Sequence, residues 1–167
     1  MENKFIRCYK LTNWNIITVC FYLLLSFFLW SYGVENKIYQ KGILFYYGFG
    51  TQFFIYSFQY RALRNFNYFL IWMGIAIIHF CIFLSIKDSP ELALENGHAS
   101  LGLRSTIISL LLFQFLRYVS LKIQKKELVA PAKQSKTDLL DERKITIVDI
   151  ICFITFMVVT IFFLVRR

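Results

Sequence analysis

The sequence predicts an all-α membrane protein, a bundle of five transmembrane helices, and three observations predict it. Hydrophobic residues make up 57% of the 167 residues, and they come in blocks of about 20, the length with which an α-helix crosses roughly 30 Å of hydrocarbon. Charged residues make up 17%, below the usual quarter of a soluble protein. Lysine and arginine gather in alternate connections between the blocks, as in multi-span membrane proteins. Residues 1–167 thus form a single transmembrane helical domain.

Five apolar blocks define the expected spans, which cover residues 16–34, 42–60, 66–86, 101–121 and 145–165. The block at 101–121 is the weakest, because it contains Arg104 and Arg117. An arginine at the bilayer centre costs about 2.5–3.5 kcal/mol on insertion scales. Both arginines stand near the ends of the block, where long side chains reach the interface. The alternative fold has four spans plus one interfacial helix at this block.

The charges of the connections favour five spans. The N-terminal segment, the connection after 42–60 and the connection at 122–144 are basic, whereas the connection at 87–98 is acidic. If 101–121 lay flat, the most basic and the acidic connections would share one side of the membrane, against the positive-inside rule. We therefore expect the N-terminus in the cytoplasm and the C-terminus outside, with the terminal Arg166–Arg167 pair as the misfit.

The net charge of +9 follows from these membrane flanks, so we expect no nucleic-acid partner. Residues 122–144 form a basic cytoplasmic loop, a surface on which anionic lipid headgroups or a soluble partner can dock. Frequent Lys, Ile, Phe and Asn suggest an AT-rich bacterial genome, and hence a bacterial inner (plasma) membrane. The docking residues expected in this loop are Lys122, Lys125, Lys126, Lys133, Lys136, Arg143 and Lys144.

Polar side chains inside the predicted spans need a partner within the protein or a functional reason, because hydrocarbon offers no hydrogen-bonding group. Asp149 lies about one turn into its span, where it can pair with Lys144, Arg143 or Arg117, or belong to an ion path. Amides inside spans commonly bridge helices. The intramembrane polar candidates are His79, Arg104, Gln114, Arg117, Asp149, Gln52 and Gln59.

No pattern in the sequence indicates catalysis, so we expect no enzyme, no catalytic residue and no metal site. The four cysteines form no CxxC pair, and a phosphate-binding loop and an HExxH motif are both missing from the sequence. His79 and His98 fall at similar predicted depths, and two such histidines can ligate a haem iron. We expect no cofactor, with haem at His79 as the alternative.

These observations predict a small polytopic inner-membrane protein that acts by association. It would be an accessory or scaffold subunit of a membrane complex, or a homo-oligomer, with membrane lipids and a protein partner or a second copy as its contacts. One alternative is an oligomeric channel or membrane-permeabilising effector, with Asp149, Arg104 or Gln114 around a shared axis. A second alternative is a haem- or quinone-binding membrane anchor subunit that uses His79.

Overall fold

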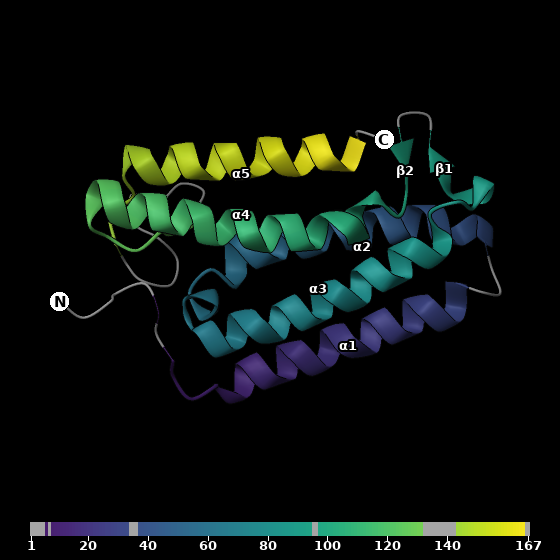
Figure 1. Ribbon diagram of the computed structural model, residues 1–167, viewed down its shortest axis with the longest axis horizontal. Coiled ribbons are helices and arrows are strands. Elements are labelled where there is room, and N and C mark those ends of the chain that lie inside the picture. The colour runs from purple at the N-terminus through teal and green to yellow at the C-terminus, as the bar shows by residue number, and fades with distance from the viewer. Residues whose placement is uncertain (1–5, 7, 34–36, 95–96, 132–142, 166–167) are drawn as a thin grey trace.

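The chain folds into a bundle of long helices that lie side by side (Figure 1). The computed structural model describes residues 6, 8–33, 37–94, 97–131 and 143–165. Within them the long helices are α1 (Asn13–Gly33), α2 (Lys37–Phe58), α3 (Phe66–Ile86), α4 (Leu101–Gln124) and α5 (Ile147–Val165). Two short 3-10 helices, η1 (Ala62–Arg64) and η2 (Pro90–Leu92), flank α3, and the two-residue strands β1 (Ala93–Leu94) and β2 (Gly97–His98) pair antiparallel.

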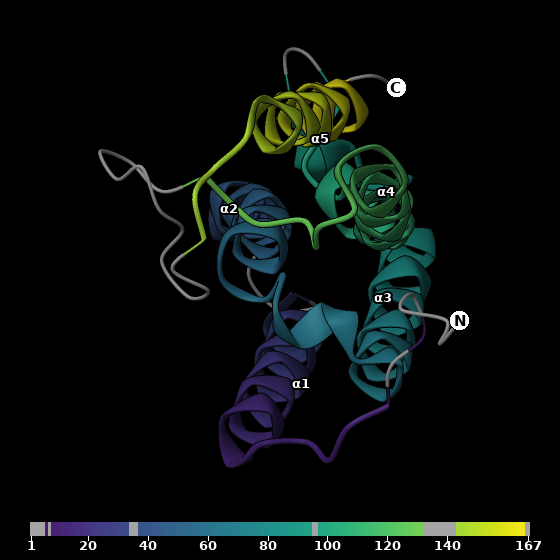
Figure 2. The same cartoon turned by 90° about the vertical axis from the view of Figure 1, so that its left-hand side faces the viewer.

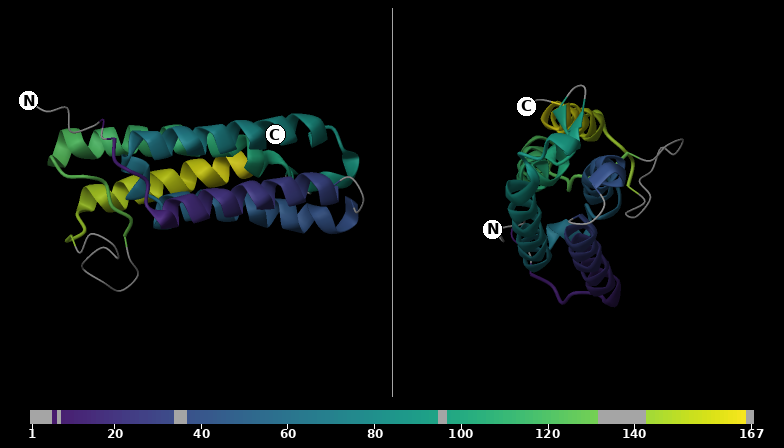
Figure 3. Two further views of the ribbon diagram at one scale, coloured as in Figure 1. Left: turned by 90° about the horizontal axis from the view of Figure 1, so that it is seen from below. Right: turned by 90° about the vertical axis from the view of Figure 1, so that its right-hand side faces the viewer.

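Successive helices run in opposite directions, so that α1, α3 and α5 are parallel to one another and antiparallel to α2 and α4 (Figures 1 and 3). Helix α4 packs against α2, α3 and α5, and α1 stands at the edge of the bundle against α3 and α2. The end-on view shows α1 and α5 on opposite sides of the bundle (Figure 2). The start of α1 and the end of α5 therefore lie at opposite ends of the molecule.

Among the described residues, four helices are long and apolar enough to cross a membrane, over Asn13–Ser31, Phe66–Ile86, Leu101–Gln124 and Ile147–Val165. They include α4, the block that the sequence marked as weakest. Its place in the middle of the bundle does not suit a helix lying flat at the interface. The helix outside this set is α2, because its middle contains Tyr46, Tyr47, Thr51 and Gln52. The helical, membrane-type fold is thus confirmed, whereas the number of spans remains a prediction.

The predicted span at 66–86 coincides with α3, whose first turn is capped by the Asn65 side chain, which accepts a hydrogen bond from the Asn67 backbone. Helix α1 begins three residues before its predicted span, and α4 ends three residues after its own. Helices continue past the hydrocarbon into polar sequence, which a hydropathy pattern does not detect. Helix α2 covers Lys37–Phe58 rather than 42–60, because the chain turns into η1 after it.

The start of α5 is set by Thr146 and Asp149 rather than by hydropathy. The Thr146 backbone N–H donates to the Asp149 carboxylate (2.9 Å), and the Asp149 N–H donates to the Thr146 hydroxyl (3.4 Å). This reciprocal pair is a capping box with aspartate in the acidic position. Helix α5 therefore begins at Ile147, two residues after the predicted start of its span.

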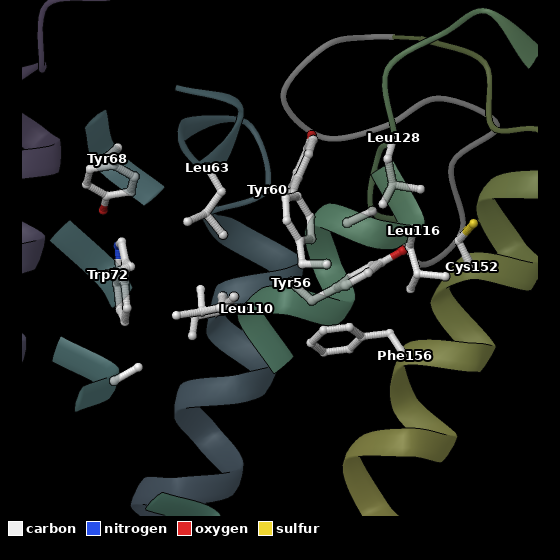
Figure 4. Close-up of a cluster of buried hydrophobic side chains, with 14 of the residues drawn as sticks. Tyr56, Tyr60, Leu63, Tyr68, Trp72, Leu110, Leu116, Leu128, Cys152 and Phe156 are labelled. Atoms are coloured by element: carbon white, nitrogen blue, oxygen red, sulfur yellow. The ribbon is translucent and has the colours of Figure 1, made fainter. Parts of the chain in front are cut away.

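The core of one half of the bundle is a cluster of large buried side chains from α2, α3, α4 and α5 (Figure 4). The rings of Tyr56 and Phe156 lie 4.5 Å apart between centroids. Lipid tails are as apolar as these side chains, so van der Waals packing rather than the hydrophobic effect holds the helices together.

The connection after α4, predicted as a basic loop over 122–144, begins after Gln124 and is partly buried in the bundle. Lys125 adopts the left-handed conformation (φ 56°) that commonly ends a helix, and the chain then folds back. Leu128 and Val129 are fully buried in the aromatic cluster, where Figure 4 shows Leu128 near Leu116. Residues 132–142 lie outside the described residues.

Helices α2 and α4 cross at Gly48 and Gly102. A Cβ built on Gly48 would lie 2.6 Å from the Gly102 Cα atom, closer than real Cβ atoms approach any neighbour. Small residues at a crossing let two membrane helices come into backbone contact. The close approach brings the Gln52 side chain into hydrogen-bonding range of the Gly102 carbonyl (2.9 Å).

Candidate functional site

A fully buried histidine, His79 on α3, joins four helices. Its Nε2 atom lies 2.8 Å from the Tyr47 hydroxyl on α2 and 3.0 Å from the Ser26 hydroxyl on α1. Its Nδ1 atom lies 3.3 Å from the Thr106 hydroxyl on α4. The Ser26 and Tyr47 hydroxyls are themselves 3.0 Å apart. The residues from which these side chains come are far apart in sequence, so the cluster exists only when the bundle is assembled.

The hydroxyl protons of Ser26 and Thr106 have acceptors on their own helices. The Ser26 hydroxyl donates to the Tyr22 carbonyl (2.7 Å), and the Thr106 hydroxyl donates to the Gly102 carbonyl (3.3 Å). Which ring nitrogen of His79 donates follows from its tautomer. The three hydroxyl groups and the imidazole ring thus form one continuous polar cluster that reaches from α4 to α1.

Ser26 also lines a groove between α1 and α3, which we call the α1–α3 groove. Its volume is about 420 Å³, and apolar side chains such as Leu23, Phe27 and Ile78 make up most of its wall. Ligand sites are commonly clefts of about 300–1,000 Å³ with mainly apolar walls and a few polar groups that fix orientation. The Ser26 oxygen lies 3.0 Å from both the Tyr47 hydroxyl and the His79 Nε2 atom. Ser26 is thus the residue through which the His79 cluster reaches the wall of the groove.

A second polar cluster lies at the end of the bundle where α4 ends and α5 begins. Arg117 makes a two-point ion pair with Glu127, with nitrogen–oxygen distances of 2.8 and 3.1 Å. Arg143 contacts both carboxylate oxygens of Asp149 at 2.7 Å. The Gln124 amide also donates to Asp149 (3.1 Å). Asp149 is fully buried. Of the three basic residues that the sequence suggested as its ion-pair partner, the structure shows Arg143 in contact with it.

The three predicted amides all connect separate segments. Gln52 donates to the Gly102 carbonyl and to the Ser105 hydroxyl on α4. Gln59 accepts from the Tyr68 hydroxyl on α3 (2.9 Å). Gln114 donates to the Leu63 carbonyl in η1 (2.8 Å).

Arg104 lies near the start of α4, with its guanidinium group 5.7 Å from the centre of the Phe83 ring. The positive charge and the ring face attract one another at this distance. Arg104 belongs to neither polar cluster, and it lies at the end of the bundle opposite to Arg117.

The predicted docking residues have different surroundings in the structure. Lys122 lies on α4 with its ammonium group 5.5 Å from the centre of the Tyr118 ring. Lys125, Lys126 and Lys144 are exposed, whereas Arg143 is engaged with Asp149. Lys133 and Lys136 lie outside the described residues. Docking at this surface stays a prediction.

The described residues contain no group of three or more His, Cys, Asp or Glu side chains that could hold a metal ion. His98 lies 2.6 Å from the Ser100 hydroxyl and 3.0 Å from the Ser89 carbonyl oxygen. His79 has side-chain contacts at both ring nitrogens, so iron ligation would require one of them to break. The haem hypothesis remains untested.

Sequence reasoning found His79 but missed its partners Ser26, Tyr47 and Thr106. Serine and threonine are common in membrane helices, and nothing in their local sequence marks these two. A signal was present in α1, where Thr18, Tyr22 and Ser26 recur at four-residue spacing and form the buried stripe of an otherwise exposed helix. Such a polar stripe indicates the face that meets other helices.

Comparison with protein-family models, with curated proteins and with solved structures finds no match to this chain.

Proposed function

We propose that this chain is a five-span integral membrane protein that acts as a small accessory subunit, by binding rather than by catalysis. Five helices of similar length with alternating direction support the number of spans. Among the described residues, helix α2 is outside the four helices that are apolar enough to span a membrane by composition, but its Thr51 and Gln52 side chains are buried against its neighbours. Its outer face instead presents side chains such as Ile43 and Phe53.

We further propose that the end of the bundle with the start of α1 faces the cytoplasm of a bacterial inner membrane. This end carries Lys10, Arg61, Lys122 and Lys125, in keeping with the positive-inside rule. Alkaline phosphatase folds to its active form only outside the cytoplasm. A fusion after Val165 is expected to be active and a fusion after Lys125 inactive; equal activity of the two fusions would contradict the orientation.

The ligand that the geometry favours is an apolar, bilayer-resident molecule with one hydroxyl or carbonyl group, of the quinone or isoprenoid-alcohol kind. One observation carries this proposal: Ser26 lies 3.0 Å from the buried His79 ring and is also part of the wall of the α1–α3 groove. The apolar walls accept a chain from the surrounding lipid. A hydroxyl group on the ligand donates to Ser26, and a carbonyl group accepts if the serine proton turns from Tyr22 toward the groove.

A photoactivatable isoprenoid alcohol in nanodiscs tests the ligand. Cys81 lines the groove and is exposed, so Cys81→Trp fills the groove and is expected to abolish labelling of α1 and α3. Ser26→Ala removes the hydrogen-bonding group and is expected to weaken labelling by about two- to twelvefold, the cost of one hydrogen bond of about 0.5–1.5 kcal/mol. Ile154→Trp, on the exposed face of α5, is the matched control and leaves labelling unchanged.

Two results would overturn the ligand proposal. One is equal labelling of the α1–α3 groove and of the exposed face of α5. The other is labelling that persists in Cys81→Trp while that variant unfolds at the same temperature as the parent protein. Either result would show that the probe reports ordinary lipid contact.

The proposal also includes a protein partner or a second copy of the chain in the bilayer. Its support is α1, which stands at the edge of the bundle and exposes Phe21, Phe27 and Phe28. The mass of the particle purified in mild detergent tests it, and a bare monomer would refute it. We do not extend the proposal to a channel, because Asp149 and Gln114 face partners within the same chain.

A further inference from the structure

A large pocket lies at the end of the bundle where α1 begins and α2 ends. Its volume is about 740 Å³, and its walls come from the segment before α1, the first turn of α1, the end of α2 and η1. We call it the interfacial pocket. It is separate from the α1–α3 groove, with which it shares no lining residue.

One wall of the interfacial pocket is held in place by Asn65. The Tyr9 backbone N–H donates to the Asn65 side-chain oxygen (3.3 Å), and the Asn65 amide donates to the Tyr9 carbonyl (2.9 Å). The same Asn65 oxygen accepts from the Asn67 backbone and caps α3. The segment before α1 is thereby tied to the start of α3, so the pocket is a built feature of the fold rather than a gap between loose segments.

The charge of the interfacial pocket is positive. Lys10, Arg61 and Arg64 line it, and none of its described lining residues is acidic. Arg64 also lies 3.9 Å from the Glu127 carboxylate, which is outside the described lining of the pocket. The described lining of the pocket thus carries three basic side chains and no carboxylate.

The rim of the interfacial pocket has the chemistry of the membrane surface. Tyr9 and Trp14 are exposed there, and such amphipathic rings favour the headgroup level. Phe58, the last residue of α2, is exposed and lines the same pocket. From Phe58 the apolar part of α2 runs toward the middle of the bundle. A ligand in the pocket therefore contacts both basic side chains and apolar rings.

We propose that the interfacial pocket binds the phosphate headgroup of an anionic glycerophospholipid from the leaflet that this end of the bundle faces. The phosphate lies between Lys10 and Arg61, with its glycerol and upper acyl chains against Trp14 and Phe58. A lipid satisfies both parts of the pocket at once, whereas a free phosphate ion would leave the apolar part uncovered. This proposal does not depend on the ligand of the α1–α3 groove.

Native mass spectrometry of the full chain, released from nanodiscs of mixed phosphatidylcholine and phosphatidylglycerol, tests the proposal. The parent protein is expected to retain one phosphatidylglycerol. Each basic residue near an anionic surface contributes about 1 kcal/mol, so Lys10→Gln/Arg61→Gln is expected to lower the retained fraction about thirtyfold. The matched control is Lys122→Gln/Lys125→Gln, which removes two cations at the same end outside the pocket and leaves retention unchanged.

Lys10→Gln alone keeps the test decisive if the double variant folds poorly, because Lys10 is exposed and precedes α1; it is expected to lower retention about fivefold. Equal loss of lipid in the pocket and control variants would overturn the proposal, since the general charge of this end would then explain retention. Displacement of the lipid by millimolar inorganic phosphate would also overturn it, because the site would then recognise a soluble anion.

Discussion

The crossing of α2 and α4 at Gly48 and Gly102 allows the sharpest test of this fold. Gly48→Ala adds one methyl group, and its carbon would lie 2.6 Å from the Gly102 Cα and 3.0 Å from the Gly102 carbonyl carbon. Both atoms are backbone, so no side chain can rotate away. The methyl reaches an ordinary contact of 3.4 Å only if the two helices separate by about 0.8 Å.

The cost of that separation follows from two contributions. Inserting a methyl into a packed interface typically costs about 1–3 kcal/mol. The hydrogen bond from Gln52 to the Gly102 carbonyl lies at the same crossing, and its loss adds about 0.6 kcal/mol, the average for such bonds between membrane helices. For a chain of this length, about 1 kcal/mol lowers the unfolding temperature by roughly 2–4 °C. We therefore expect a decrease of roughly 3–14 °C.

Thermal unfolding in detergent, followed by a thiol-reactive fluorogenic dye at the buried Cys152, measures the change. Gly50→Ala is the matched control, because it lies on the same helix and its added Cβ meets no atom within 4 Å. Alanine favours a helix over glycine by up to about 1 kcal/mol, so the control is expected to be neutral or slightly stabilised. Equal unfolding temperatures for the two variants would refute the close crossing. The exposed cysteines are first replaced by serine: Cys8, Cys20 and Cys81.

Three further variants test the other end of the bundle. Asp149→Asn leaves Arg143 beside a neutral side chain and is expected to lower the unfolding temperature. The double variant Asp149→Asn/Arg143→Gln is expected to recover part of that loss, with a coupling free energy of about 0.5–3 kcal/mol in a double-mutant cycle. A coupling free energy near zero would contradict the ion pair. Asn65→Ala removes a helix cap, at a cost of about 1 kcal/mol, and frees the segment before α1, so limited proteolysis is expected to cleave that segment faster; an unchanged cleavage rate would show that Asn65 does not hold it. Leu128→Ala is expected to cost about 2–5 kcal/mol, against little change for the exposed Ile123→Ala; similar values for the two would show that the chain after α4 does not enter the core.

The positions of the helices could be predicted from the sequence because the bilayer imposes one length on them. Helix α3 has the predicted bounds, since it is apolar from end to end. The observed bounds depart most from the prediction at α2, where the polar and small residues that lower hydropathy are the ones that meet other helices. Gln52 was a candidate contact residue in the sequence, but its partner Gly102 could not be chosen without the register of the two helices.

The candidate site could be predicted only in part, for a related reason. His79 was conspicuous as a histidine within an apolar block. Two of its partners are the hydroxyl groups of Ser26 and Thr106. In any helix such a hydroxyl group can donate to the carbonyl four residues earlier, as both residues do here. Only the packing of four helices shows that these hydroxyls also serve His79. The interfacial pocket was missed because it needs hydrogen bonds between the Tyr9 backbone and the Asn65 side chain, which are far apart in sequence.

The bond between Tyr9 and Asn65 has a consequence for the order of events during synthesis. The two residues are separated by 56 positions, and chains grow at about 5–20 residues per second. The segment before α1 therefore leaves the ribosome roughly 3–11 seconds before its anchor exists. During that interval α1 has no contact with α3, and its orientation is decided by its own flanking charges. The later arrival of Asn65 fixes an orientation already chosen, so a defect at Asn65 is expected to alter the finished structure without inverting the protein in the membrane.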